Sequence, residues 1–212
     1  MEPALSLKTT LIFDFDGTIA DSLHRLLEIS NSFAEEYGYL QVSKEDIPRF
    51  REKTAMEAFR ELKVPLLKVP LIVRRVRKAF RQEAHLACPY SDMQAVLPGL
   101  SRRYRLGILT SNSALNVRSF LRQHQLEYFD FIYTSGRLLG KSRVLHRIMK
   151  EKNLLANEIM FVGDEIRDVE AARKAGIEVI AVSWGANTKK ALLSAGPTYL
   201  IQNAAELNQL LL

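Results

Sequence analysis

A short apolar segment near the N-terminus ends in two acids and reads Leu11-Ile12-Phe13-Asp14-Phe15-Asp16-Gly17-Thr18. Side chains two residues apart on a strand point the same way, so the carboxylates of Asp14 and Asp16 are expected to meet at one point. Burying two like charges together is costly unless a cation neutralises them. Ligand sets made only of oxygen favour Mg²⁺. The segment therefore predicts a buried strand that runs into a magnesium site, with Gly17 permitting a tight departure of the backbone.

Further short runs of strand-forming residues alternate with helical stretches along the chain. The predicted strands are Thr10–Phe15, Leu106–Thr110, Phe131–Thr134, Ile159–Val162, Val179–Val182 and Thr198–Ile201. The predicted helices are Ala114–His124, Ser142–Asn153, Ile166–Ala175, Thr188–Ala195 and Ala204–Leu211. Such alternation is typical of an α/β fold with a parallel sheet and helices on both faces. Ligands bind beyond the carboxyl ends of the strands in such sheets, so the polar residues that follow the strands are the candidates for chemistry.

The connection between the first two strands is unusually long. A βαβ unit takes roughly 30 residues, whereas here a mostly helical stretch from about 21 to 89 intervenes. Its predicted helices are Ser22–Tyr37, Thr54–Leu62 and Leu71–Leu86. We therefore expect an α/β core at 1–20 and 90–212, with an inserted α-helical cap at 21–89 that lies over the site like a lid.

The composition fits a soluble globular protein. Of the 212 residues, 47% are hydrophobic and 25% are charged. No apolar run approaches the roughly 18 residues of a membrane span, and the N-terminal segment is too short for a secretory signal. The single cysteine, Cys88, excludes an internal disulfide and fits a reducing compartment. A cytoplasmic location without membrane association is expected.

The net charge is +6, and the densest cluster of basic residues lies in one predicted helix. Its basic residues are Arg74, Arg75, Arg77, Lys78 and Arg81. Apolar residues at helical spacing (Ile72, Val73, Val76, Ala79 and Phe80) place the basic residues on the opposite face. This pattern predicts a solvated helix surface, with steering of a phosphorylated substrate as the alternative. Because no nucleic-acid motif accompanies the charge, no nucleic-acid partner is expected.

Four segments, in order, resemble the motifs of the haloacid dehalogenase-like superfamily. Asp14-Phe15-Asp16-Gly17-Thr18 is similar to motif I, and Leu109-Thr110-Ser111-Asn112 to motif II. Gly140-Lys141-Ser142 is similar to motif III, although the proline that often follows the lysine is Ser142 here. Gly163-Asp164-Glu165-Ile166-Arg167-Asp168 is similar to motif IV, and its continuation to Gly176 resembles the phosphoglycolate phosphatase-like branch. The resemblance implies a Rossmann-like core with an inserted helical cap.

The resemblance also implies residue roles. Asp14 would be the nucleophile that accepts a phosphoryl group, and Asp16 would protonate the leaving alcohol and then activate water. Mg²⁺ would be held by Asp14, the backbone carbonyl of Asp16, and Asp164. Asp168 would hold a metal-bound water or orient Lys141. Glu165 could do the same, or could be a solvated surface carboxylate.

Phosphate binding is assigned by the same resemblance to Thr110, Ser111, Asn112 and Lys141. The Thr110 hydroxyl would bind one phosphate oxygen, and backbone amides near Ser111 and Asn112 would bind others. Lys141 would offset the negative charge of the transition state, with Lys150 and Lys152 as alternatives for that lysine.

The acid at position 16 selects among the activities of the superfamily, because a leaving alcohol needs a proton and a leaving halide does not. We therefore expect a Mg²⁺-dependent phosphatase acting on a small phosphorylated metabolite, such as a phosphoglycolate-like or sugar phosphate. A phosphomutase and a non-catalytic phosphate-binding protein are the alternatives. In the predicted cap, Arg49, Arg51, Lys53 and Thr54 are candidates for reading the substrate. The oligomeric state is left open.

Overall fold

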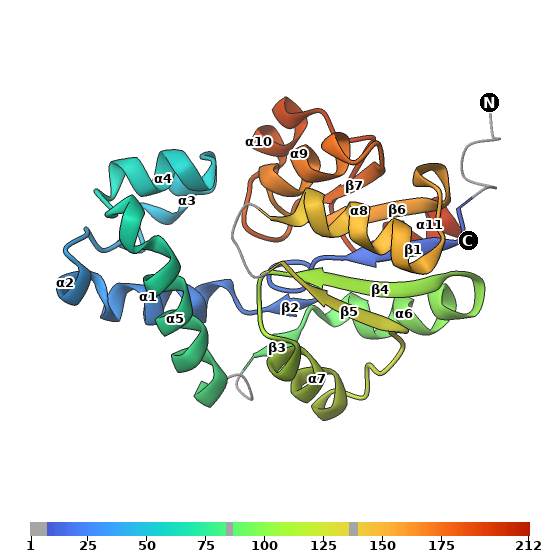
Figure 1. Cartoon of the computed structure of the whole chain (residues 1–212), viewed down its shortest axis with the longest axis horizontal. Coiled ribbons are helices and arrows are strands. Elements are labelled where there is room, and N and C mark those ends of the chain that lie inside the picture. The colour runs from blue at the N-terminus through green and yellow to red at the C-terminus, as the bar shows by residue number, and fades with distance from the viewer. Residues whose placement is uncertain (1–7, 84–86, 136–139) are drawn as a thin grey trace.

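The computed structural model describes residues 8–83, 87–135 and 140–212. Its centre is a six-stranded sheet in which every neighbouring pair of strands is parallel, in the order β5-β4-β1-β6-β7-β8 (Figure 1). The strands are β1 (Thr10–Phe13), β4 (Arg105–Thr110), β5 (Phe131–Thr134), β6 (Ile159–Gly163), β7 (Glu178–Val182) and β8 (Tyr199–Ile201). The carboxyl ends of all six strands therefore lie along one edge of the sheet.

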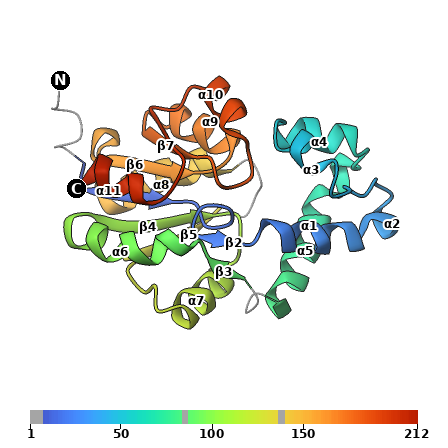
Figure 2. The same ribbon diagram turned by 180° about the vertical axis from the view of Figure 1, so that it is seen from behind.

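Helices cover both faces of this sheet, as the two opposite views show (Figures 1 and 2). They are α6 (Ser91–Arg103), α7 (Ala114–Gln123), α8 (Lys141–Lys152), α9 (Ile166–Lys174), α10 (Lys189–Ala195) and α11 (Ala205–Leu211). Alternate residues of β1 point to opposite faces: Leu11 and Phe13 pack with α6, α7 and α11, and Ile12 packs with α8, α9 and α10. The predicted α/β class, with a parallel sheet covered on both faces, is confirmed.

Two predictions in the core were wrong in detail. The first strand ends at Phe13 rather than at Phe15, because the Phe15 carbonyl accepts N–H groups of residues 18–20 and closes a turn. Helix α6 was not predicted, because Pro98 and Gly99 interrupt its pattern. The remaining strands and helices of the core begin and end within one residue of the predictions.

A group of helices, which we call the insert (residues 23–83), leaves and rejoins the core through a short antiparallel pair, β2 (Ala20–Asp21) and β3 (Cys88–Pro89). It lies beyond the carboxyl edge of the sheet, at the left of Figure 1. Its helices are α1 (Leu23–Ser32), α2 (Ala34–Tyr37), α3 (Ile47–Phe50), α4 (Ala55–Glu61), a 3₁₀ turn (Leu66–Lys68) and α5 (Val69–Glu83).

The first predicted helix of the insert was wrong as one piece, because it is divided at Phe33 into α1 and α2 and stops at left-handed Gly38. The end of the predicted helix 71–86 falls partly outside the described residues. The division into a core and a cap stays a prediction. Within the described ranges, no helix has both the length and the apolar character that crossing a membrane requires.

Candidate active site

The predicted site residues gather where the three central strands end. Asp14 follows β1, Thr110 ends β4, and Asp164 follows β6. Because β4, β1 and β6 are adjacent in the sheet, these three residues are brought to one place from positions far apart in sequence. All three are buried, with at most 3% of the residue exposed.

Lys141 lies between two of the predicted acids. It is the first residue of α8, and its Nζ lies 2.6 Å from Asp14 Oδ2 and 2.5 Å from Asp168 Oδ1. All three side chains are nearly inaccessible to solvent. The second oxygen of Asp14 accepts the Phe15 N–H at 2.8 Å, so its carboxylate is held at both ends. The alternative lysines, 150 and 152, belong to the last turn of α8, far from this cluster.

Asp164 is fixed by neighbours from two other segments of the chain, residues 17–18 and 185–186. Its Oδ1 accepts the Thr18 hydroxyl at 2.7 Å, and its Oδ2 accepts the Ala186 N–H at 2.7 Å. Gly17 has a φ of +82°, and a Cβ atom there would lie 2.2 Å from Asp164 Oδ2. At Gly185 a Cβ atom would lie 2.4 Å from the Gly17 carbonyl oxygen. Glycine is therefore needed at both positions for the motif I turn to approach this carboxylate.

Three carboxylates form a group that could hold a divalent metal ion: Asp14, Asp164 and Asp168 each offer an oxygen within 4.8 Å of the others. Burial raises the pKa of Asp14 to about 7, helped by the charges of Asp168 and Glu165 and opposed by Lys141. Burial and the same neighbouring acids raise the pKa of Asp164 well above its ordinary value. These raised pKa values show that Lys141 compensates the buried charge only in part. A divalent cation among these oxygens fits the donor set and would supply the missing positive charge.

Asp16 stands apart from this metal-binding group. Its carboxylate accepts hydrogen bonds from the Ser22 hydroxyl at 2.7 Å and from the Asn112 side-chain amide at 3.1 and 3.3 Å. Burial raises the pKa of Asp16, although both hydrogen bonds oppose the rise. The two motif I acids thus have different surroundings: Asp14 faces an ammonium group, and Asp16 faces neutral donors.

The motif II residues arrange this neighbourhood. Thr110 Oγ1 accepts the Asn112 N–H at 2.9 Å, and the Asn112 side-chain oxygen accepts from the Ser113 N–H and from Asn116 Nδ2. The side chain of Asn112 therefore holds Asp16, a contact that the sequence did not predict. Ser111 is half-buried in the same turn, next to the hydroxyl of Thr110.

Glu165 is paired with another residue of motif IV, and its part in holding a metal-bound water or orienting Lys141 stays a prediction. Its carboxylate forms an ion pair with Arg167, and both side chains are largely buried, so the solvated surface carboxylate was wrong. Burial lowers the pKa of Arg167, but the charges of Glu165, Asp168 and Asp14 outweigh it and leave this pKa raised. Arg167 thus adds a second cation to the site. Its place within motif IV was a signal that could have been used.

The insert is attached to the core beside Asp164 by one loop, residues 185–188. The Arg51 guanidinium donates to the carbonyls of Gly185 (2.8 Å) and Ala186 (3.2 Å), and Asn187 Nδ2 donates to the carbonyls of Arg51 (2.9 Å) and Lys53 (3.0 Å). The same loop binds the core, because the Asn187 N–H donates to the Asp164 carbonyl and Asn187 Oδ1 accepts the Ile166 N–H.

The other candidate substrate readers, Arg49, Lys53 and Thr54, contact neighbouring groups within the insert. Arg49 pairs with Asp46 and Glu61, Lys53 pairs with Glu61 at 2.9 Å, and Thr54 caps α4. Among the described residues, no hydrogen bond or ion pair joins these side chains to Asp14, Asp164 or Asp168, so their reading of a substrate stays a prediction.

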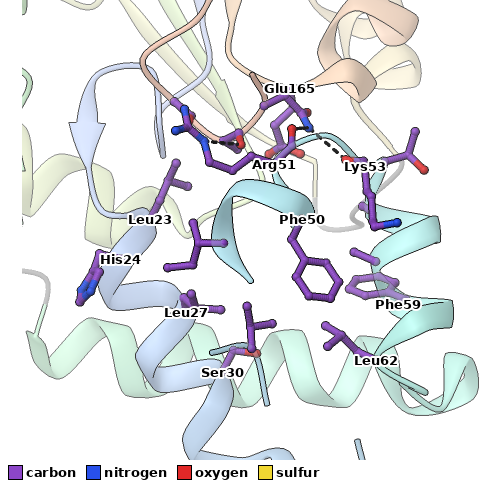
Figure 3. A pocket seen from close by; sticks show the side chains of 18 of the residues that line it. Leu23, His24, Leu27, Ser30, Phe50, Arg51, Lys53, Phe59, Leu62 and Glu165 are labelled. Carbon is purple, nitrogen blue, oxygen red and sulfur yellow. Dashed lines mark hydrogen bonds between the residues drawn. The ribbon is translucent and has the colours of Figure 1, made fainter. Parts of the chain in front are cut away.

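A cavity of about 470 Å³ is lined by the insert and, at one end, by residues of the core (Figure 3). Its walls are mostly apolar side chains of α1, α3 and α4, including Leu27, Phe50 and Phe59. Arg51 and Glu165 lie at its core end. Asp14, Asp164 and Asp168 do not line it, so this cavity adjoins the acid cluster and does not contain it.

Comparison with known proteins agrees with this geometry. The chain matches the family model of haloacid dehalogenase-like hydrolases over residues 11–182. It is similar to the phosphoglycolate phosphatase of Synechococcus elongatus, at 32% identity over 203 residues, covering 94% of this chain and 95% of that protein. It is also similar to the phosphorylated carbohydrates phosphatase of Thermotoga maritima, at 27% identity over 215 residues, covering 94% and 97%.

A solved structure shares the fold. The haloacid dehalogenase-like family hydrolase from Streptococcus pneumoniae superposes with a TM-score of 0.81 at 22% identity, covering 98% of this chain and 100% of that one. The predicted enzyme class, a phosphatase, is supported by the relatives and is confirmed. The chain therefore belongs to the haloacid dehalogenase-like hydrolase family, in its phosphoglycolate phosphatase-like branch.

Proposed function

We propose that this protein hydrolyses small phosphomonoesters with Mg²⁺, through an aspartyl-phosphate on Asp14. The observation that carries the proposal is the contrast between the two motif I acids. One is a carboxylate held against a buried lysine, and the other is a carboxyl group with a raised pKa among neutral donors. A nucleophile and a proton donor, side by side, are what hydrolysis of an alcohol ester through a covalent intermediate needs.

In the first step, an oxygen of Asp14 attacks phosphorus, and the bond between phosphorus and the leaving oxygen breaks. The Phe15 N–H and Lys141 hold this carboxylate in place. Lys141 and Arg167 place positive charge close to the phosphoryl group, whose negative charge must be stabilised throughout the transfer. The Thr110 hydroxyl, at the end of β4, would donate to one phosphoryl oxygen.

Asp16 moves the protons in this scheme. Because its pKa is raised, it holds a proton closer to neutral pH than an ordinary aspartate does, and it gives that proton to the leaving alcohol. As a carboxylate it then takes a proton from the water that attacks the phosphoryl group on Asp14. Ser22 and Asn112 orient the carboxyl group for both transfers.

Mg²⁺ would be held by Asp14, Asp164 and the backbone carbonyl of Asp16, with Asp168 orienting Lys141. Bound there, it would neutralise charge on the phosphoryl oxygens. The insert would act as a cap that excludes water while the intermediate forms. The similarity to phosphatases of phosphoglycolate and of phosphorylated carbohydrates supports a small phosphorylated metabolite as the substrate.

The test measures release of inorganic phosphate from a panel of phosphomonoesters, with Mg²⁺ and with a chelator. We expect turnover that the chelator abolishes and that Asp14→Asn reduces to background with the circular dichroism spectrum unchanged. Glu170→Gln, which alters an exposed acid on α9, is the matched control and should retain activity. Activity surviving in Asp14→Asn would refute the covalent mechanism, and isomerisation without phosphate release would indicate a phosphomutase.

A further inference from the structure

One arginine of the basic helix differs from its neighbours. Arg74, Arg75, Lys78 and Arg81 of α5 are exposed, as the charge pattern predicted, but Arg77 is half-buried. Placing Arg77 on the solvated face was therefore wrong. Its Nη2 atom is buried and has no hydrogen-bond partner among the residues that the structure describes. Burying a guanidinium donor without a partner is unfavourable, so the arrangement suits a ligand that supplies the missing acceptor.

The packing of α5 shows which way Arg77 faces. Phe80, one helical turn further on, is 2% exposed and packs in the same cluster as Phe15 and Ile19. Those two residues flank the turn that carries Asp16. Residues three apart on a helix share a face, so Arg77 lies on the side of α5 that is turned toward the Asp16 turn.

The charges around Arg77 agree with this placement. Burial lowers the pKa of Arg77. The nearby Arg167 guanidinium lowers this pKa further, whereas the carboxylate of Asp16 raises it. Both of these groups belong to the active site. Arg77 therefore lies within electrostatic range of charged groups of the site, although it belongs to the insert.

We propose that Arg77 binds a negatively charged group on the leaving side of the substrate, and so makes the enzyme selective for phosphate esters whose leaving group is itself an anion. This proposal rests on the proposed function, in which Asp16 protonates the leaving oxygen. A group attached beyond that oxygen would meet the guanidinium next, on the Asp16 side of the site.

The guanidinium fork matches the two oxygens of a carboxylate or of a phosphate equally well. An oxyanion on the leaving group is therefore the shared chemistry. Phosphoglycolate presents a carboxylate there, and pyrophosphate presents a phosphate. In 2-hydroxyethyl phosphate a neutral hydroxymethyl group replaces the carboxylate of phosphoglycolate, so it is the matched uncharged probe.

The experiment compares kcat/KM for these two esters and for pyrophosphate, a phosphoanhydride, in the wild type, Arg77→Gln, Arg77→Lys and the exposed control Arg74→Gln. For Arg77→Gln we expect a loss of about 10- to 100-fold on an anionic substrate, the effect of one charge-assisted hydrogen bond. Turnover of 2-hydroxyethyl phosphate should stay within about 2-fold, as should all three activities of Arg74→Gln. Arg77→Lys should recover part of the loss, because it keeps the charge.

The two anionic probes identify the group that is read. A loss on phosphoglycolate alone assigns a carboxylate, and a loss on pyrophosphate alone assigns a phosphate. Equal losses on all three substrates would show a structural role and overturn the proposal, as would no loss on any.

A binding measurement separates this proposal from the proposed function. Calorimetry with Mg²⁺ compares phosphoglycolate and pyrophosphate binding to Asp14→Asn and to Asp14→Asn with Arg77→Gln. If the wild type releases no phosphate from any ester, the proposed function fails. Weaker binding of either anion in the double variant still supports Arg77 as the anion site, and unchanged binding of both overturns it.

Discussion

Replacing Gly17 by alanine tests how closely the motif I turn approaches Asp164. The added Cβ atom would lie 2.2 Å from Asp164 Oδ2, so one of the two must move by about 1 Å or more to reach van der Waals distance. Such a shift breaks the hydrogen bond from the Ala186 N–H or the one from the Thr18 hydroxyl. The substitution also places alanine at a φ of +82°, which costs about 1–2 kcal/mol by itself.

The chain contains a matched control for the backbone part of this cost. Gly38 in the insert has a φ of +75°, and no described atom lies within 4 Å of the position that its Cβ would take. Gly38→Ala should therefore lower the free energy of unfolding by about 1–2 kcal/mol, the backbone cost alone. Gly17→Ala should lower it by a further 1.5–3 kcal/mol or so, because a hydrogen bond to a charged group is lost.

The assay is urea denaturation of both variants in chelator, followed by the Mg²⁺-induced rise in melting temperature. Gly38→Ala should keep the full Mg²⁺ response, and Gly17→Ala should lose most of it because one of the three metal-binding acids is displaced. Equal destabilisation of the two variants, together with an equal Mg²⁺ response, would refute the close approach of the turn to Asp164.

Three further predictions concern the buried charges and the loop at 185–188. Lys141→Met should destabilise the metal-free protein at pH 8 by about 3–5 kcal/mol in urea denaturation, since it leaves buried carboxylates unpaired. The exposed control Lys150→Met should change stability little, and an equal effect of both would contradict the buried pair. The pKa of Asp14 is raised to about 7 in the folded state. Its protonated carboxyl group therefore contributes to the free energy of unfolding below about pH 4, and this contribution is lost as the pH rises through 7. The free energy of unfolding in chelator should therefore fall by up to about 1.4 kcal/mol per pH unit in that window, and a stability that rises there would exclude the raised pKa. Asn187→Ala should speed hydrogen exchange at residues 51–53, whose carbonyls its side chain binds, and unchanged exchange would show that the loop does not hold the insert.

Much of the fold could be predicted because its determinants are local. The apolar run before Asp14 and the alternation that follows Thr110 specify a parallel sheet without any tertiary information. The parallel sheet predicted that polar residues after the strands would lie at one edge, which covers Asp14, Thr110 and Asp164. Lys141 opens a helix, and it was placed with Asp14 only by the resemblance to motif III.

What could not be predicted depends on three-dimensional packing. Helix α6 contains Pro98 and Gly99 and is kept helical by the apolar contacts of the core, which local propensity does not include. Arg77 looked like one basic residue among five, and only the burial of Phe80 in the core cluster that contains Phe15 and Ile19 shows that this side of the helix turns inward. The contacts of the loop at 185–188 join the side chains of Arg51 and Asn187 to backbone carbonyls 134 residues away, and a backbone acceptor cannot be recognised from a sequence pattern.

The loop at 185–188 has a thermodynamic consequence of its own. The same few residues hold the Asp164 carboxylate through the Ala186 N–H and hold the insert through Arg51 and Asn187. Binding of a cation to the acid cluster and movement of the insert would therefore be linked by a coupling free energy. This coupling is reciprocal. If movement of the insert changes the affinity for the cation by some factor, binding of the cation changes the equilibrium between insert positions by the same factor. In the proposed mechanism, a substrate that draws the insert inward would therefore change the affinity of the acid cluster for the cation, and the cation would change the affinity for that substrate by the same factor.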